Sequence, residues 1–117
     1  MRRYQKGFIF WNKIVMWFIL VYIVNSDNKE ADMVISHLLE QKLIACANKF
    51  SIQSSFMWKW NLENENEVVA LCKSMERNWS KIKSEVEKVH SYETPCIIKV
   101  ESEANKEFEE WVDSEVL

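Results

Sequence analysis

Glycine and proline are almost missing from this chain, which has one of each among 117 residues. Linkers between domains are usually rich in such residues, and no stretch of that composition divides the sequence. We find no internal repeat and no low-complexity run. With 48% hydrophobic residues and six tryptophans, the chain is typical of one globular domain with a buried core.

Cysteine is also scarce, and its pattern excludes two classes of protein. The three cysteines, Cys46, Cys72 and Cys96, are odd in number, far apart and without CxxC spacing. This pattern predicts neither a disulfide framework nor a structural zinc knuckle. It favours a reducing compartment, and we therefore expect a cytoplasmic protein.

Acidic residues are missing from the start of the chain and outnumber basic residues after residue 26. The first 26 residues contain Arg2, Arg3, Lys6 and Lys13 and no acid, whereas the remainder has 11 basic and 18 acidic residues, a net charge of −7. Nucleic-acid binding requires a basic face, so an acidic body argues against a nucleic-acid partner. A cation is the better electrostatic match.

The longest apolar run, FIFWNKIVMWFILVYIV at residues 8–24, raises the question of membrane targeting. Asn12 and Lys13 interrupt it, and the uninterrupted part, 14–24, is about half of the roughly 20 residues that a spanning helix needs. Its β-branched and aromatic content favours a buried strand. We expect an N-terminal extension at 1–15 and a folded domain at 16–117 that does not enter a membrane. Organelle targeting or membrane association of the extension is the alternative.

The remaining pattern predicts alternating strands and helices. Ser26 or Asp27 can cap a helix whose apolar positions recur at spacings of three and four: Ala31, Val34, Ile35, Leu38, Leu39 and Leu43. The aromatic and β-branched segment 44–60 and the segment 67–73 read as two strands of a long hairpin, with the turn at 61–66.

A second helix is predicted from Ser74 or Met75, and it must end before Pro95. A strand at 96–100 and a last helix from about Asn105 follow. The order is β-α-β-β-α-β with a trailing helix, which predicts an α+β, ferredoxin-like sandwich.

Four segments in register resemble the CutA family of divalent-cation tolerance proteins: EQKLIACAN (40–48), SSFMWKWNLENENEVVALCKS (54–74), HSYETP (90–95) and FEEWV (108–112). Several positions depart from the family pattern, among them Ser51 in place of a Pro-Gly pair and Ala104 in place of a glycine. Trp60 replaces the glycine that usually follows the hairpin tryptophan, and Ser91 replaces the proline after the motif histidine. Ile23 occupies the position of a cysteine that one family metal site uses.

The resemblance implies a homotrimer joined through sheet edges and long hairpins, with clefts between subunits. We expect Phe56, Met57 and Trp60 at the trimer interface and Tyr92, Lys73 and Trp58 in the cleft. The residues favour the same assembly, because an aromatic hairpin offers more apolar surface than one small sheet can cover.

The resemblance also implies a divalent metal ion, with copper expected first and zinc or another ion as alternatives. The family's cysteine and motif histidine correspond to Cys46 and His90, and the carboxylate of Glu93 can complete the site or orient the imidazole. The residues alone leave an alternative in which His90 stabilises the end of a helix and Cys46 is a buried, inert thiol.

Other functional classes have less support. No nucleophile is paired with a histidine at a recognisable spacing and no phosphate-binding glycine loop is present, so we do not expect an enzyme. The acidic run ENENE at 63–67 reads as solvated charge, with weak cation binding as a secondary role. The alternative function is a non-catalytic trimeric sensor or scaffold that binds a small molecule or a partner protein in the inter-subunit cleft.

Overall fold

A computed structural model describes residues 17–117. The predicted extension at 1–15 and the first residues of the predicted strand and domain lie outside this range. The described elements are β1 (Phe18–Asn25), α2 (Asn28–Glu40), β2 (Cys46–Trp58), β3 (Asn61–Met75), a 3₁₀ turn η1 (Glu76–Asn78), α3 (Trp79–Val89), β4 (Ile97–Ser102) and α4 (Lys106–Glu115). None of the helices in residues 17–117 is long and apolar enough to span a bilayer.

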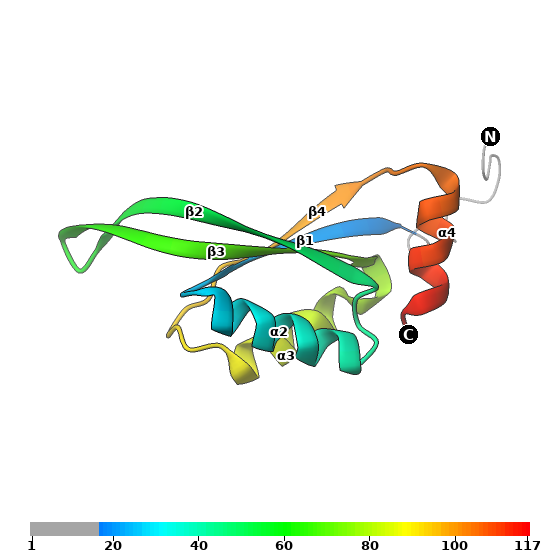
Figure 1. Cartoon of the computed structure of the whole chain (residues 1–117), viewed down its shortest axis with the longest axis horizontal. Helices are drawn as coiled ribbons and strands as arrows, with labels where there is room; N and C mark the ends of the chain where they lie inside the picture. The colour runs from blue at the N-terminus through cyan, green and yellow to red at the C-terminus, as the bar shows by residue number, and fades with distance from the viewer. Residues whose placement is uncertain (1–16) are drawn as a thin grey trace.

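The four strands form one antiparallel sheet in the order β2-β3-β1-β4. Helices α2 and α3 lie side by side on one face, and α4 sits at one end of the sheet, away from the hairpin tip (Figure 1). The predicted ferredoxin-like order with a trailing helix is confirmed.

Alternation along β1 builds the core. Ile19, Val21 and Ile23 are fully buried among residues of the two covering helices, including Val34 and Leu38 of α2. Burying each such side chain contributes about 1.5–3 kcal/mol relative to leaving it exposed. The stripe predicted for the first helix is confirmed at Ala31, Val34 and Leu38 of α2. Leu43 is buried as well, but it lies beyond the end of α2 at Glu40. Leu39 is exposed, because it projects from the side of α2 that faces away from the sheet.

The predicted position of the hairpin turn is wrong. Strand β3 begins at Asn61, which pairs with Trp58, so the turn consists of Lys59 and Trp60 instead of residues 61–66. Both turn residues have positive φ angles, 51° at Lys59 and 72° at Trp60. A two-residue turn of this kind matches strand twist, and the alternating NLENEN segment can then continue as strand.

The predicted start of the second helix is also wrong. Ser74 and Met75 pair with Ile19 and Phe18 as the last residues of β3. The Ser74 hydroxyl also donates to the Leu43 carbonyl at 2.5 Å. These sheet and side-chain contacts hold both residues extended, so η1 intervenes and α3 begins only at Trp79.

Candidate functional site

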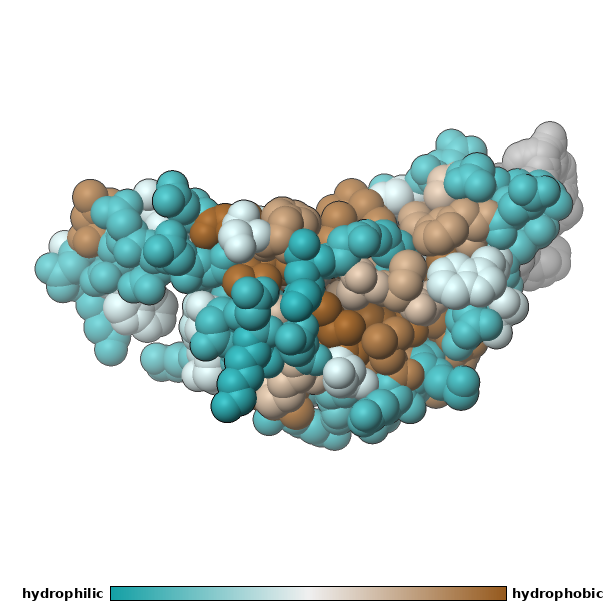
Figure 2. All heavy atoms as spheres, viewed as in Figure 1, coloured by the Kyte–Doolittle hydropathy of each residue, from teal (hydrophilic) through white to brown (hydrophobic). Residues whose placement is uncertain are grey.

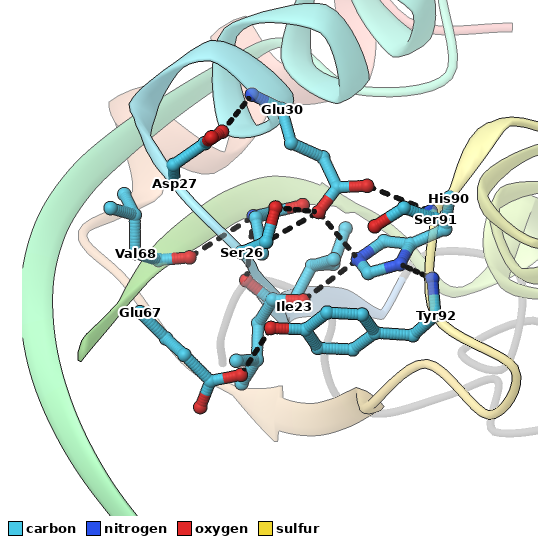
Figure 3. A network of polar contacts seen from close by, with 11 residues as sticks. Ile23, Ser26, Asp27, Glu30, Glu67, Val68, His90, Ser91 and Tyr92 are labelled. Carbon is cyan, nitrogen blue, oxygen red and sulfur yellow. Dashed lines mark hydrogen bonds and ion pairs between the residues drawn. The ribbon is translucent and has the colours of Figure 1, made fainter. Parts of the chain in front are cut away.

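A network of polar contacts joins the end of α3 to the start of α2 and the middle of the hairpin (Figure 3). At its centre, the side chain of His90 is fully buried. Its Nε2 lies 2.8 Å from the Val24 carbonyl, and its Nδ1 accepts from the Tyr92 backbone N–H at 3.1 Å. These partners assign a neutral ring with its proton on Nε2, and both ring nitrogens are engaged within the subunit.

Tyr92 extends the network to the hairpin. Its hydroxyl donates to Glu67 Oε2 at 2.5 Å, and its ring meets the His90 ring edge-on at 4.9 Å between centroids. Burial, followed by the hydrogen bond to Glu67, raises the pKa of Tyr92, so the phenol remains a donor. Glu67 is only 7% exposed, which corrects the prediction that the whole run 63–67 is solvated charge.

Sequence reasoning placed Glu67 in the run 63–67, with weak cation binding as a secondary role, but did not single it out. The burial of this position depends on Tyr92, which lies 25 residues further along the chain. The change from polar residues to VVALC at Val68 does mark the place where the hairpin enters the body. A carboxylate at such a boundary can be either solvent-exposed or buried, and here the contact with Tyr92 decides that it is buried.

Glu30 ties the same loop to the start of α2. Its Oε1 accepts from the Ser26 backbone N–H and hydroxyl at 2.8 and 2.9 Å, and its Oε2 accepts from the Ser91 N–H at 2.7 Å. Burial alone raises the pKa of Glu30, but the hydrogen bonds from Ser26 and Ser91 outweigh it and lower the pKa to about 2. The group is therefore a carboxylate at neutral pH. Sequence reasoning missed Glu30 as well.

An open hollow of about 490 Å³ adjoins the network between the start of α2 and the middle of the hairpin. Nine residues line it: Ser26, Asp27, Asn28, Ser51, Ile52, Gln53, Asn66, Glu67 and Val68. Two of them are carboxylates, and none is a lysine or arginine. Glu67 lines the hollow and also accepts the hydrogen bond from Tyr92, so Tyr92 holds one of the two carboxylates in position. Carboxylate, amide and hydroxyl oxygens are suitable ligands for a divalent cation and a poor environment for an anion.

The predicted metal ligands do not meet within one subunit. Cys46 pairs with Lys73, whereas His90 binds the carbonyl of Val24, whose partner is Val69. The two positions are therefore about 13 Å apart along the strands. Glu93 is exposed in the loop after Tyr92. Among residues 17–117, no group of three or more His, Cys, Asp or Glu side chains is placed to hold a metal ion.

The predicted cleft residues are also spread along the hairpin. Tyr92 contacts Glu67, while Lys73 and the Trp58–Asn61 pair each lie six residues from Glu67 along β3. This spacing is about 20 Å in either direction. One subunit therefore does not bring Tyr92, Lys73 and Trp58 into a single pocket.

The predicted interface residues are exposed in the single subunit. Phe56, Met57 and Trp60 are 39%, 62% and 95% exposed, and hydrophobic residues stand at the far end of the otherwise hydrophilic hairpin arm (Figure 2). Strand β2 lies at an edge of the sheet. Ile98 and Val100 of the opposite edge strand are about half exposed as well.

The chain is similar to known proteins in both sequence and structure. The family model described as CutA1 divalent ion tolerance protein matches residues 19–115. The divalent-cation tolerance protein CutA of Archaeoglobus fulgidus is 37% identical over 97 residues, covering 82% of this chain and 95% of that protein. The protein of the same name from Thermotoga maritima is 37% identical over 101 residues, covering 85% and 99%.

A solved structure shows the same similarity in three dimensions. The structure described as the periplasmic divalent cation tolerance protein CutA from Archaeoglobus fulgidus superposes with a TM-score of 0.83 at 36% identity. The match covers 86% of this chain and 99% of that one.

Proposed function

This chain belongs to the CutA1 divalent ion tolerance protein family, and from that premise we propose that it is a non-catalytic protein that binds divalent cations in the response to metal ions. The family is named for cation tolerance and not for a reaction, which agrees with the lack of a recognisable nucleophile and base. We propose copper as the ion, because divalent copper is bound most tightly by most nitrogen and oxygen sites among the first-row metals.

The observation that carries the proposal is the lining of the hollow. Asp27 and Glu67 contribute negative charge, the neighbouring amides and hydroxyls contribute oxygen ligands, and no lining residue is basic. The body of the protein is acidic, which adds a favourable long-range field. An anionic metabolite would meet two carboxylates here, so the hollow favours the cation-binding function over a sensor for anions.

We propose a homotrimer as the functional assembly. The unpaired edge of β2 and the exposed side chains of Phe56, Met57 and Trp60 support association, because long apolar edge strands attract other chains. Coordination of one ion by Cys46, His90 and Glu93 remains a prediction, and it requires ligands from two subunits. His90 would also have to exchange one of its hydrogen bonds for the metal.

The protein partner and the compartment are further parts of the proposal. We propose a cytoplasmic protein, since three free cysteines suit a reducing compartment. A scaffold that holds a partner protein in the inter-subunit cleft is the competing function. It would leave the trimer intact and make cation binding dispensable.

Calorimetric titration of the reduced protein with Cu²⁺ tests the proposal, with the assembly mass recorded on the same samples. We expect saturable binding that Glu67→Gln weakens at least tenfold, because the carboxylate is lost while the side-chain volume is kept. Glu87→Gln, at an exposed position of α3, is the matched control. Weakening by Cys46→Ala and Glu93→Gln instead of Glu67→Gln would assign the ion to a site between subunits. Absence of binding by the wild-type trimer would favour the scaffold.

A further inference from the structure

Glu30 is a buried carboxylate that connects two segments far apart in sequence. It lies in the first turn of α2 and is 8% exposed. One oxygen binds the β1–α2 turn through Ser26, and the other binds the loop after α3 through the Ser91 N–H (Figure 3). The first oxygen also lies 3.7 Å from His90 Nε2.

The backbone before Ser91 is compatible with a proline at position 91. His90 has φ −78° and ψ 147°, the extended conformation that a residue adopts before proline. Serine supplies a backbone N–H that needs an acceptor in this partly buried place, and it lacks the ring that restricts the chain. The Glu30 carboxylate provides the acceptor.

The contact at Ser91 leads directly to the hollow. The next residue, Tyr92, binds His90 through its N–H and Glu67 through its hydroxyl. Glu67 lines the hollow. A shift of the loop at Ser91 would therefore displace the phenol that fixes Glu67.

We propose that Glu30 is a positioning residue of the cation site: by binding the Ser91 N–H, it sets the loop segment 90–92 so that Tyr92 holds Glu67 at the hollow. This inference rests on the proposed function for the identity of the ligand. Glu30 does not itself line the hollow. It bonds the lining residues Ser26 and Asp27 directly, and it reaches Glu67 only through the loop.

The competing interpretation is a helix cap. Asp27 caps α2 by accepting from the Glu30 N–H, and the bond from Glu30 back to Ser26 resembles a capping box. A cap would need only the first oxygen of Glu30. It would make α2 more stable and leave Tyr92 and Glu67 unaffected, so the two roles give different results.

The test compares Glu30→Ala and Ser91→Pro, alone and combined, in the full-length protein. Glu30→Ala should weaken Cu²⁺ binding by roughly tenfold or more, the usual effect of losing a group that orients a ligand. Adding Ser91→Pro should restore most of the affinity, because proline removes the unpaired N–H and restricts the loop. Glu30→Gln, which keeps the volume and one acceptor oxygen, replaces the alanine variant if that variant does not fold.

Glu85→Ala is the matched control. Glu85 is another buried carboxylate. It joins α3 to α2 through His37 at 2.8 Å and also pairs with Lys88 of its own helix at 2.8 Å. Its loss should lower the melting temperature and leave the Cu²⁺ affinity unchanged. Equal effects of Glu30→Ala and Glu85→Ala on affinity, or an equal loss with serine and with proline at position 91, would overturn the proposal.

A second readout is independent of metal. In the metal-free protein, Glu30→Ala should accelerate hydrogen exchange of the Ser91 amide and shift the ring resonances of Tyr92, whereas Glu85→Ala should change neither. Unchanged exchange and unchanged Tyr92 resonances would overturn the positioning role whether or not Cu²⁺ binds. Absence of Cu²⁺ binding by the wild-type protein, with these two changes present, would overturn the proposed function and keep the loop role of Glu30.

Discussion

At the residue scale, buried carboxylates hold the site together. Glu30 and Glu67 are both nearly inaccessible, and each accepts hydrogen bonds from a partner distant in sequence. A buried carboxylate is costly unless it is hydrogen-bonded, so these contacts have to persist for the ionised form to remain in place. The site is therefore expected to respond to acid.

The pKa of Glu30 gives the sign and range of that response. It falls from 4.5 to about 2 on folding, so the carboxylate stabilises the folded state fully above pH 4.5 and loses this contribution as the pH falls toward 2. The shift corresponds to about 3 kcal/mol at most. We expect Glu30→Gln to reduce the difference in unfolding free energy between pH 7 and pH 3, as measured by denaturant titration.

Glu87→Gln serves as the control for this experiment, because Glu87 is exposed on α3. It should leave the pH dependence of the unfolding free energy as it is in the wild type. A Glu30→Gln variant with the same pH dependence as the wild type would contradict the assignment of the low pKa.

At the element scale, the sequence predicts the order and type of the elements better than their ends. The apolar spacing in α2 and the alternation in β1 are local signals, and both elements appear where they are expected. The ends of β3 depend on cross-strand partners such as Ile19 for Ser74 and Trp58 for Asn61, which no local pattern contains. The hairpin turn is hard to predict for the further reason that it lacks glycine.

Dependence on distant partners also explains why the sequence points to the loop at 90–95 but not to the roles of Glu30 and Glu67. The HSYETP motif points to the loop that contacts Glu67, and Tyr92 reaches the hollow only through that residue. The roles of Glu30 and Glu67 follow only from contacts made across 61 and 25 residues of sequence. Such contacts have no spacing rule that a single sequence can show.

The turn itself yields a prediction. Lys59 and Trp60 both adopt positive φ, which costs roughly 1–2 kcal/mol per non-glycine residue. The double change Lys59→Asn with Trp60→Gly supplies the residues that this turn prefers. We expect it to stabilise the protein by about 1 kcal/mol, measured as a higher denaturant midpoint, since Trp60 is 95% exposed in the subunit.

Assembly mass must be recorded alongside, because Trp60 is also a predicted interface residue. Lys81→Asn, at an exposed position of α3, is the control for the loss of a lysine. A lower midpoint with an unchanged assembly mass would contradict the claim that the turn is strained. A lower midpoint together with a smaller assembly mass would show that the side chain of Trp60 stabilises the assembly by more than its positive φ angle costs.

At the scale of the whole molecule, one face of the sheet is covered by α2 and α3 and the other only in part by α4 (Figure 1). Phe50, Ile98 and Val100 remain exposed on this second face, and the hairpin extends well beyond the body. The single subunit measures 51 × 28 × 22 Å, an elongated shape for a chain of this length. Association through the uncovered face and the hairpin would make a more compact particle.

If the uncovered apolar face is buried on assembly, a charge placed on it should prevent assembly. Ile98→Glu places a carboxylate where apolar contact is expected, and we expect the proposed trimer to give way to a smaller species in sedimentation or native mass spectrometry. Ser80→Glu adds the same charge at an exposed position of α3 and should leave the mass unchanged. An Ile98→Glu protein with the wild-type mass would exclude this face from the interface.

The location of a bound ion tests the central claim most directly. Crystals of the reduced protein grown with Cu²⁺ can be measured just above and just below the copper absorption edge. A peak that is present in the anomalous map above the edge and lost below it is copper. The account predicts a peak in the hollow beside Asp27 and within coordination distance of a Glu67 oxygen. A peak elsewhere, or an empty hollow in a protein that binds Cu²⁺ in solution, would contradict it.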